Sequence, residues 1–139
     1  MWPQDYSARL RAWADLRIQC ESLVLPASLD RVNIWWQQTP WQPYYLHWDD
    51  RDHWPDPWQL LNDNIYCDLA RALGMLYTIT MIDRGDIIDV ELVDTDQGNL
   101  VLVNGGKYIL NWCPSLECDI PSKAFTIHHR HIYPDNFQN

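Results

Sequence analysis

Apolar residues recur every three or four positions over residues 7–24, and this spacing predicts an amphipathic helix near the start of the chain. Pro26 is expected to end that helix, because proline lacks the N–H that a helix interior needs. Ser28 or Asp30 is a suitable N-cap for a short second helix, which is expected to stop before Pro40. The first part of the chain is therefore predicted to be helical.

The same spacing returns over residues 57–74, where it predicts a central helix. Asp56 followed by Pro57 is a strong start signal, since an acidic N-cap then precedes a proline at the first helical position. Gly74 is placed to cap the C-terminus of this helix, because glycine readily adopts the left-handed conformation that often ends a helix.

After the central helix the apolar period changes to two residues, which is typical of strands. In the segment 75–83, for example, Tyr77 and Ile79 alternate with Thr78 and Thr80. Strands are expected at residues 75–83, 87–93, 99–103, 107–112 and 124–128.

The order of these elements indicates the fold class. The turn Asn104-Gly105-Gly106 joins two of the expected strands and is a good signal for a tight hairpin. Helices followed by consecutive strands predict an α+β fold, in which N-terminal helices and a central helix pack on an antiparallel meander of four or five strands. The 139 residues suit one domain, since a chain of this length buries roughly 68% of its surface on folding. Its expected parts are a helical segment (1–34), a Trp/Pro-rich loop (35–56), the central helix (57–74), the sheet (75–128) and a tail (129–139).

The loop before the central helix is unusually aromatic. The chain has nine tryptophans, and those between positions 35 and 58 are Trp35, Trp36, Trp41, Trp48, Trp54 and Trp58. Prolines in the same stretch exclude a long helix or an inner strand. Because each packed ring buries roughly 150–250 Å², the loop is expected either to fold back over the core or to dock a partner.

These alternatives differ in which indole rings stay exposed in the free protein. Trp41 and Trp48 lie in the irregular part of the loop and are expected to be exposed if the loop docks. Trp35, Trp36 and Trp58 fall on helical faces and are expected in the core. The candidate partner-binding residues are Trp41, Tyr44, Tyr45, Trp48 and Trp54.

The charge is as uneven as the aromatic content. The net charge of -9 lies in residues 49–96, which hold twelve acidic residues and three arginines. This segment is either a solvated face that keeps the domain soluble, a docking face for a basic partner, or the surface of an acidic inhibitor protein. The same charge disfavours nucleic acid as a partner, because phosphates need Lys and Arg to replace their counterions.

Membrane insertion and secretion are not expected. No run of residues approaches the roughly 18 apolar positions of a membrane span. The first residues lack an apolar stretch behind a basic one, so no signal peptide is predicted. The four scattered cysteines are accordingly expected to be reduced thiols.

The histidines near the C-terminus allow a metal hypothesis. Cys113, Cys118, His128 and His131 together offer thiolate and imidazole ligands for zinc. The spacing of the two cysteines is not that of the usual structural zinc pairs, and His128 and His129 would point to opposite faces of a strand. An exposed polar tail is therefore the preferred interpretation, and no metal or other cofactor is expected.

Cys67 lies on an expected helix and is followed by an Ala-Leu-Gly sequence and then by expected strands. In this order of elements residues 66–114 resemble the core of the transglutaminase-like cysteine enzymes. Ile87 stands at the position of the family's catalytic histidine, and the family's acid falls near Asn111. The resemblance thus implies a degenerate, inactive member of the fold, with no catalytic residues. The alternative is a cysteine hydrolase or acyl-transferase that uses Cys67 with His128 from the tail.

A second resemblance points to bacteriophages. The stretch from Trp54 to Ile79, together with residues 107–112, resembles a small uncharacterised protein of contractile-tailed phages, including those of cyanobacteria. The resemblance implies a non-enzymatic structural or assembly protein of the virion, in the neck, tail or baseplate. Its expected partners are other phage structural proteins in a symmetric assembly, and its expected location is the virion, after synthesis in the host cytoplasm.

Overall fold

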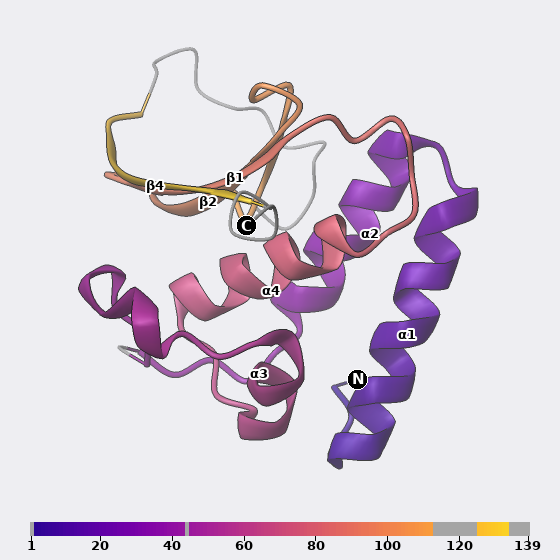
Figure 1. Ribbon diagram of the computed structural model, residues 1–139. Helices are drawn as coiled ribbons and strands as arrows, with labels where there is room; N and C mark the ends of the chain where they lie inside the picture. Colours follow the sequence, from indigo (N-terminus) through magenta and orange to yellow (C-terminus); the bar gives the residue numbers. More distant parts are fainter. Residues whose placement is uncertain (1, 44, 113–124, 134–139) are drawn as a thin grey trace.

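The computed structural model describes residues 2–43, 45–112 and 125–133. The helices are α1 (Tyr6–Ser22), α2 (Leu25–Gln37), the 3₁₀ helix η1 (Trp48–His53), α3 (Pro57–Asp63) and α4 (Asp68–Thr80). The strands are β1 (Val90–Thr95), β2 (Gly98–Val103), β3 (Tyr108–Leu110) and β4 (Ile127–Tyr133). The predicted α+β class is confirmed, with helices packed against an antiparallel sheet (Figure 1). None of the helices described here is long and apolar enough to cross a membrane.

The strands lie in the order β3-β2-β1-β4, and every pairing is antiparallel. β1, β2 and β3 form the expected meander, with Leu92 opposite Val101. β4 then pairs with the free edge of β1, where His131 lies opposite Leu92. Residues 129–133 were expected in a tail and instead belong to the sheet, so the predicted strand at 124–128 lies further along the chain.

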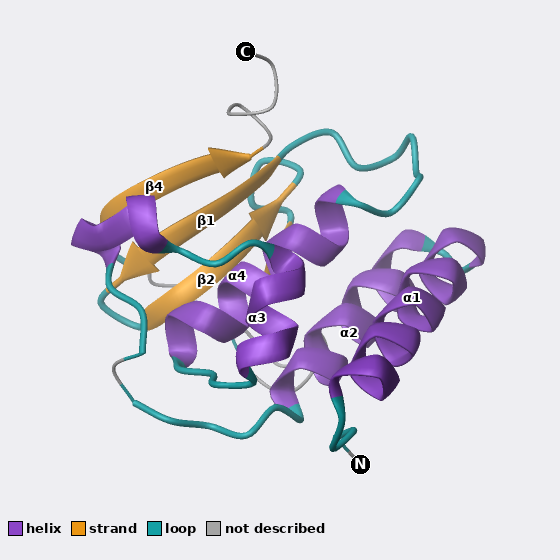
Figure 2. Ribbon diagram, turned by 60° about the horizontal axis from the view of Figure 1, so that its bottom comes forward, coloured by secondary structure: helices purple, strands orange, loops and turns teal. Residues whose placement is uncertain are grey.

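The helix α4 is the centre of the molecule. It packs against β1 and β2 on one side and against α2 and α3 on the other (Figure 2). Its buried residues are Leu69, Ala70, Ala72, Leu73, Gly74, Met75, Leu76, Tyr77, Thr78 and Ile79. The predicted strand over residues 75–83 is therefore wrong. Every residue of α4 from Ala72 to Ile79 is buried, so apolar residues do not mark a single face in this part of the helix. The alternating threonines only imitated the polar face of a strand.

The predicted central helix over residues 57–74 is two helices. Its start is confirmed, because the Asp56 carboxylate accepts a hydrogen bond from the Gln59 N–H at 2.8 Å and Pro57 begins α3. α3 ends at Asn64, whose φ of 56° is left-handed. The chain turns there, and α4 begins with Cys67 as its N-cap residue.

The boundary between the first two helices also differs from the prediction. Pro26 does not end α1 but lies in the first turn of α2. Backbone N–H groups in a first turn have no acceptor within the helix, so proline costs no hydrogen bond there. α1 is capped by Asp5, whose side chain accepts a hydrogen bond from the Ala8 N–H at 2.7 Å. α2 consequently starts earlier than Ser28.

Three helices meet at the buried hydroxyl of Thr78. The indole N–H groups of Trp13 on α1 and Trp36 on α2 both donate to the Thr78 Oγ1, each at 2.9 Å. The hydroxyl in turn donates to the Gly74 carbonyl oxygen at 2.8 Å. One donor and two acceptor sites are all that a hydroxyl offers, so this group is fully used.

Gly74 lies in the middle of α4 instead of capping a helix. A Cβ at this position would lie 2.5 Å from the Trp36 ring, far inside van der Waals contact. Glycine is needed here because the indole packs directly on the helix backbone. This close packing brings α2 near enough for Trp36 to reach Thr78.

We predict that Thr78→Val destabilises the protein by about 2–4 kcal/mol, because it leaves two buried indole N–H groups without an acceptor, each costing roughly 1–3 kcal/mol. Thr78→Ser keeps the hydroxyl and is expected to cost only about 1 kcal/mol for the lost methyl group. Urea unfolding of the three proteins measures both differences. A valine variant as stable as the serine variant would contradict this role of the hydroxyl.

Candidate functional site

The aromatic loop divides into a part that folds back and a part that stays exposed. The Trp48 ring stacks on His129 of β4, with centroids 5.5 Å apart and planes at 14°. Trp54 meets Trp48 at 5.1 Å and His131 at 5.6 Å, both edge to face. Trp48 and Trp54 are half-buried in consequence. The expected exposure of Trp48 is therefore wrong, because η1 packs on the β4 edge of the sheet.

Trp41 is the exposed part, and its expected exposure is confirmed: 58% of the residue is accessible to solvent. Its backbone is nevertheless fixed, since Trp41 forms a parallel β-bridge with Tyr66 and the Gln42 N–H donates to the Tyr66 carbonyl at 2.7 Å. Tyr66 is fully buried and packs edge-on against Trp2 and Trp36. The exposed indole thus stands on an anchored segment of chain.

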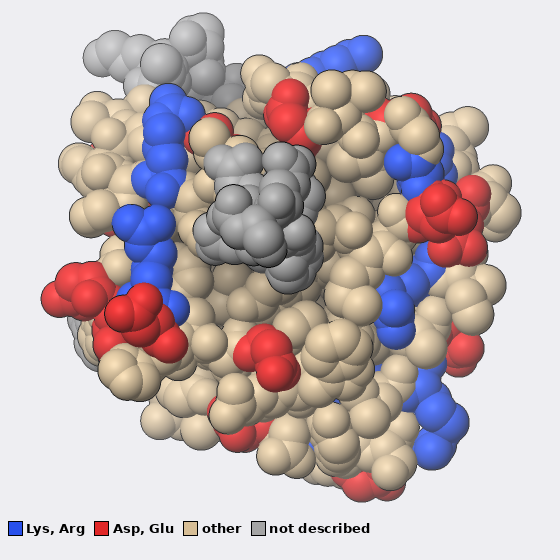
Figure 3. Space-filling view, viewed as in Figure 1, with Lys and Arg blue, Asp and Glu red and all other residues tan. Residues whose placement is uncertain are grey.

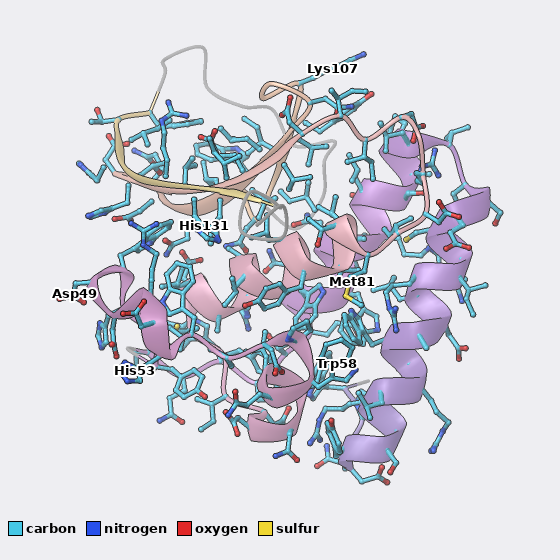
Figure 4. All side chains as sticks on the ribbon, viewed as in Figure 1. Asp49, His53, Trp58, Met81, Lys107 and His131 are labelled. Carbon is cyan, nitrogen blue, oxygen red and sulfur yellow. The ribbon has the colours of Figure 1, made fainter. Side chains whose placement is uncertain are left out.

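The helical tryptophans follow the prediction only in part. Trp36 is buried at 1% exposure, as expected, and Trp35 is half-buried beside it. Trp58 was expected in the core and is instead 48% exposed, as Figure 4 shows at the surface of α3. It contacts Trp13 edge-on at 6.0 Å, but the buried face of this short helix is occupied by Leu60 and Leu61.

A pocket of about 260 Å³ lies beside Trp41. It is formed between the loop, the first turn of α4 and the start of β2. The residues that line it are Trp41, Pro43, Leu46, Cys67, Asp68, Leu69 and Asn99. Its walls are thus mostly apolar, and Asp68 and Asn99 supply polar groups.

Asp68 joins the N-terminus of α4 to the sheet. Its Oδ2 accepts hydrogen bonds from the Asn99 backbone N–H at 2.8 Å and from the Asn99 Nδ2 at 2.9 Å. Its Oδ1 accepts from the Asn111 Nδ2 at 3.0 Å. Gly98, with φ of 111°, permits this approach, because a Cβ there would lie 3.2 Å from the Asp68 Oδ2.

The amide network continues from Asn111, whose φ of 63° is left-handed, a conformation that Asn tolerates better than most residues. Its N–H donates to the Asn33 Oδ1 at 2.9 Å, and its Oδ1 accepts from the Gln37 Nε2 at 3.0 Å. The Asn99 Oδ1 accepts from the Trp48 indole N–H at 2.7 Å. The network therefore connects α2, α4, η1 and the ends of β2 and β3. Sequence reasoning missed it, although an acid in the first turn of a helix and Asn residues at strand ends are visible signals.

Cys67 lines this pocket and is 5% exposed. Its Sγ accepts a hydrogen bond from the Leu46 N–H at 3.4 Å. His128, its partner in the enzymatic alternative, is exposed on β4 at the point where the pairing with β1 slips by one residue. Among the described residues no hydrogen bond joins Cys67 to a histidine. The amides around the thiol bind hydrogen-bonding groups but do not take up a proton at neutral pH.

The two positions implied by the transglutaminase-like resemblance have different surroundings. Asn111, near the position of the family's acid, contacts Asp68 beside Cys67. Ile87 precedes β1 and packs against the core.

The structure describes two of the four candidate metal ligands, His128 and His131. Cys113 and Cys118 lie outside the described residues, as does Tyr44 among the candidate docking residues. His128 and His131 both lie on β4, and His131 contacts Trp54. Within residues 2–43, 45–112 and 125–133, no group of three or more His, Cys, Asp or Glu is arranged to hold a metal ion.

The segment from Trp41 to Asp68 is rich in acidic residues. Residues 41–68 contain six aspartates and one arginine. The Tyr45 hydroxyl donates to the Asp63 Oδ2 at 2.7 Å, and burial together with this hydrogen bond raises the pKa of Tyr45 to about 12. On η1, the hydrogen bond to Asp50 raises the pKa of His53, and Arg51 lies over the Trp48 ring at 5.7 Å. On the face in Figure 3 the acidic side chains are separated by basic and uncharged ones, so no continuous acidic stripe crosses this face.

Comparison with known proteins gives no further guide to the site. No protein-family model, curated protein or solved structure matches this chain.

We predict that His128→Ala leaves the alkylation of Cys67 by iodoacetamide unchanged within about twofold, since the thiol has no histidine hydrogen-bonded to it. Peptide mapping measures the rate, and Cys20 is the internal reference. Cys20 is buried, and burial raises its pKa. A fall of about tenfold or more at Cys67 alone would show that His128 activates the thiol and would favour the enzymatic alternative.

Proposed function

We propose that this protein is a non-enzymatic docking protein whose contact surface is centred on Trp41. The observation that supports this most strongly is the combination of a 58% exposed indole with an anchored backbone. Exposed aromatic side chains next to a pocket are typical binding anchors, because they bury a large area while losing little conformational freedom.

The rest of the aromatic loop supports this anchor. Trp48 and Trp54 hold η1 on β4, and Tyr45 is tied to Asp63 at the end of α3. Leu46 lies between these points, and Trp41 is fixed separately by its bridge to Tyr66; both line the pocket. The two residues are therefore preorganised, and a partner that binds them loses little entropy in ordering them.

The setting that we propose for this docking is the virion of a contractile-tailed bacteriophage. The resemblance of residues 54–79 and 107–112 to a phage protein supports it. In such a particle the partners are other structural proteins of the neck, tail or baseplate, repeated by symmetry. An acidic surface with a fixed aromatic anchor suits contact with larger structural subunits.

We predict that a photo-crosslinking amino acid at Gln42, next to Trp41 and exposed, captures a partner protein in the native assembly. The same group at Ile88, which is 76% exposed near the start of β1, is expected to capture far less. Gel electrophoresis and mass spectrometry of the adducts give the two yields. Equal yields at both positions would contradict a contact surface centred on Trp41.

The anchor itself is tested in the crosslinkable background with Trp41→Ala and Trp58→Ala. Truncating a true anchor costs about 2 kcal/mol or more of binding, so Trp41→Ala is expected to lower the yield from Gln42 at least about tenfold. Trp58→Ala removes an equally large, 48% exposed indole on α3 and is expected to leave the yield unchanged. Thermal unfolding of both variants separates a binding defect from a folding defect.

We further predict that tryptic peptides of this protein are present in purified phage particles, in an amount that matches a symmetric position. Mass spectrometry against an abundant capsid peptide measures the copy number. Absence from the particles would overturn the virion setting and leave the docking role to be placed elsewhere.

A further inference from the structure

The pocket beside Trp41 combines an exposed aromatic wall with apolar neighbours. The Trp41 ring has no ring partner among the described residues, whereas Trp48 and Trp54 contact each other edge to face and each contacts a histidine of β4. Pro43, Leu46 and Leu69 line the same space. An indole face of this kind attracts a cation, and apolar walls cover the methylene stem of a long charged side chain.

The polar wall of the pocket is negatively charged. The three hydrogen bonds that Asp68 accepts from Asn99 and Asn111 leave room on its carboxylate, which has about four acceptor sites. The N-terminus of α4 contributes a positive partial charge of roughly half a unit, which the full charge of Asp68 outweighs. Arg71, one turn along α4, directs its guanidinium to the Thr39 Oγ1 and carbonyl oxygen, both at 2.8 Å. Burial lowers the pKa of Arg71, and the charge of Asp68 partly offsets this, so the two side chains interact electrostatically. Among the described residues no ion pair joins them, and the Asp68 carboxylate can still accept a hydrogen bond from a further cation.

The surroundings of the pocket add a smaller negative potential. η1 carries Asp49, Asp50 and Asp52 together with Arg51 and His53, and His53 is paired with Asp50. It adjoins the pocket where the Trp48 indole N–H donates to Asn99. Figure 4 shows Asp49 and His53 at the surface of η1, on the side of the N-terminal end of α4. Asp63 is held at the other side through Tyr45, the residue before Leu46.

We infer that the pocket receives an arginine side chain of the partner protein. The inference rests on the docking function proposed above and gives the chemistry of its central contact. The guanidinium lies against the Trp41 indole and donates one hydrogen bond to the Asp68 carboxylate, while its stem lies along Leu46 and Leu69. A planar guanidinium is suited to both contacts at once, because it stacks on an aromatic face while its N–H groups point outward.

The test uses the full chain, labelled with ¹⁵N, and the peptide acetyl-Gly-Gly-Arg-Gly-Gly-amide. We expect saturable shifts of the Trp41 indole N–H and of the Leu46 and Asn99 backbone N–H signals, with a Kd on the order of 1 mM for a single side chain. The same peptide with citrulline keeps the shape without the charge and is expected to bind at least about threefold more weakly. Raising NaCl from 50 to 500 mM is expected to weaken binding of the arginine peptide, because exposed charges are screened.

Single substitutions test whether the arginine side chain contacts both Trp41 and Asp68. Trp41→Ala and Asp68→Asn are each expected to raise the Kd at least about threefold, whereas Trp58→Ala and Asp15→Asn on other surfaces are expected to leave it unchanged. The amide spectrum of each variant reports its fold. If Asp68→Asn disturbs the network, the double variant Asp49→Asn, Asp52→Asn supplies the charge test, because both side chains are exposed.

The inference is overturned if the citrulline peptide binds equally well, if folded charge variants bind unchanged, or if the shifts map to another surface. It also fails if no shifts appear. Crosslinking from Gln42 distinguishes this failure from that of the docking function, since a captured partner without arginine binding leaves the docking surface in place.

Discussion

The hydroxyl of Thr78 is the contact on which the rest of the molecule depends. α4 is buried on nearly every side, so the buried hydroxyl of Thr78, in its last turn, must be satisfied by its neighbours. Two indole N–H groups from α1 and α2 meet that requirement. Each indole would itself be an orphaned donor without Thr78, so the three side chains fix the positions of three helices together.

The position of α4 determines the candidate site. α2 and α3 pack on one side of the helix, and β1 and β2 pack on the other. Its first turn meets the ends of β2 and β3 through the hydrogen bonds of Asp68. Asp68 lies at that junction and gathers the amides of Asn99 and Asn111. The aromatic loop then crosses the same end, held by Tyr66 at one point and by β4 at another. The exposed indole and the carboxylate are thus neighbours because of how the core packs.

Local signals in the sequence identified the elements whose cause is local. Asp56-Pro57 begins a helix, and Asn104-Gly105-Gly106 adopts the left-handed backbone of a hairpin between β2 and β3. The α+β class follows from the order of such signals. Where the outcome depends on distant residues, the same reasoning was wrong. Thr78 was interpreted as part of the polar side of a strand, because the indole groups that satisfy it in a helix lie 65 and 42 positions away and leave no signal in the local pattern.

Gly74 and the site residues show the same limit. Glycine near the end of an apolar run is typical of a C-cap, and only the Trp36 ring explains why it lies mid-helix. Trp58 has helical spacing but belongs to a short surface helix, so its ring stays half exposed. The Asp68 network could not be inferred, because Asn residues in loops and strand ends are common and their partners lie 31 and 43 positions away.

These long sequence separations have a consequence for folding kinetics. Trp13 and Thr78 are joined across 65 positions, and Asp68 and Asn111 across 43, so large loops must close before α4 gains its stabilising partners. The entropy of loop closure is lost before these contacts form, which favours a slow, cooperative transition over the early formation of separate helices. The residues of α4 that are buried in the folded protein are mostly apolar, and they stay exposed to water until both layers cover the helix. A nascent chain that ends before β2 therefore carries its most hydrophobic segment uncovered, and this is the state in which the protein is most prone to aggregate.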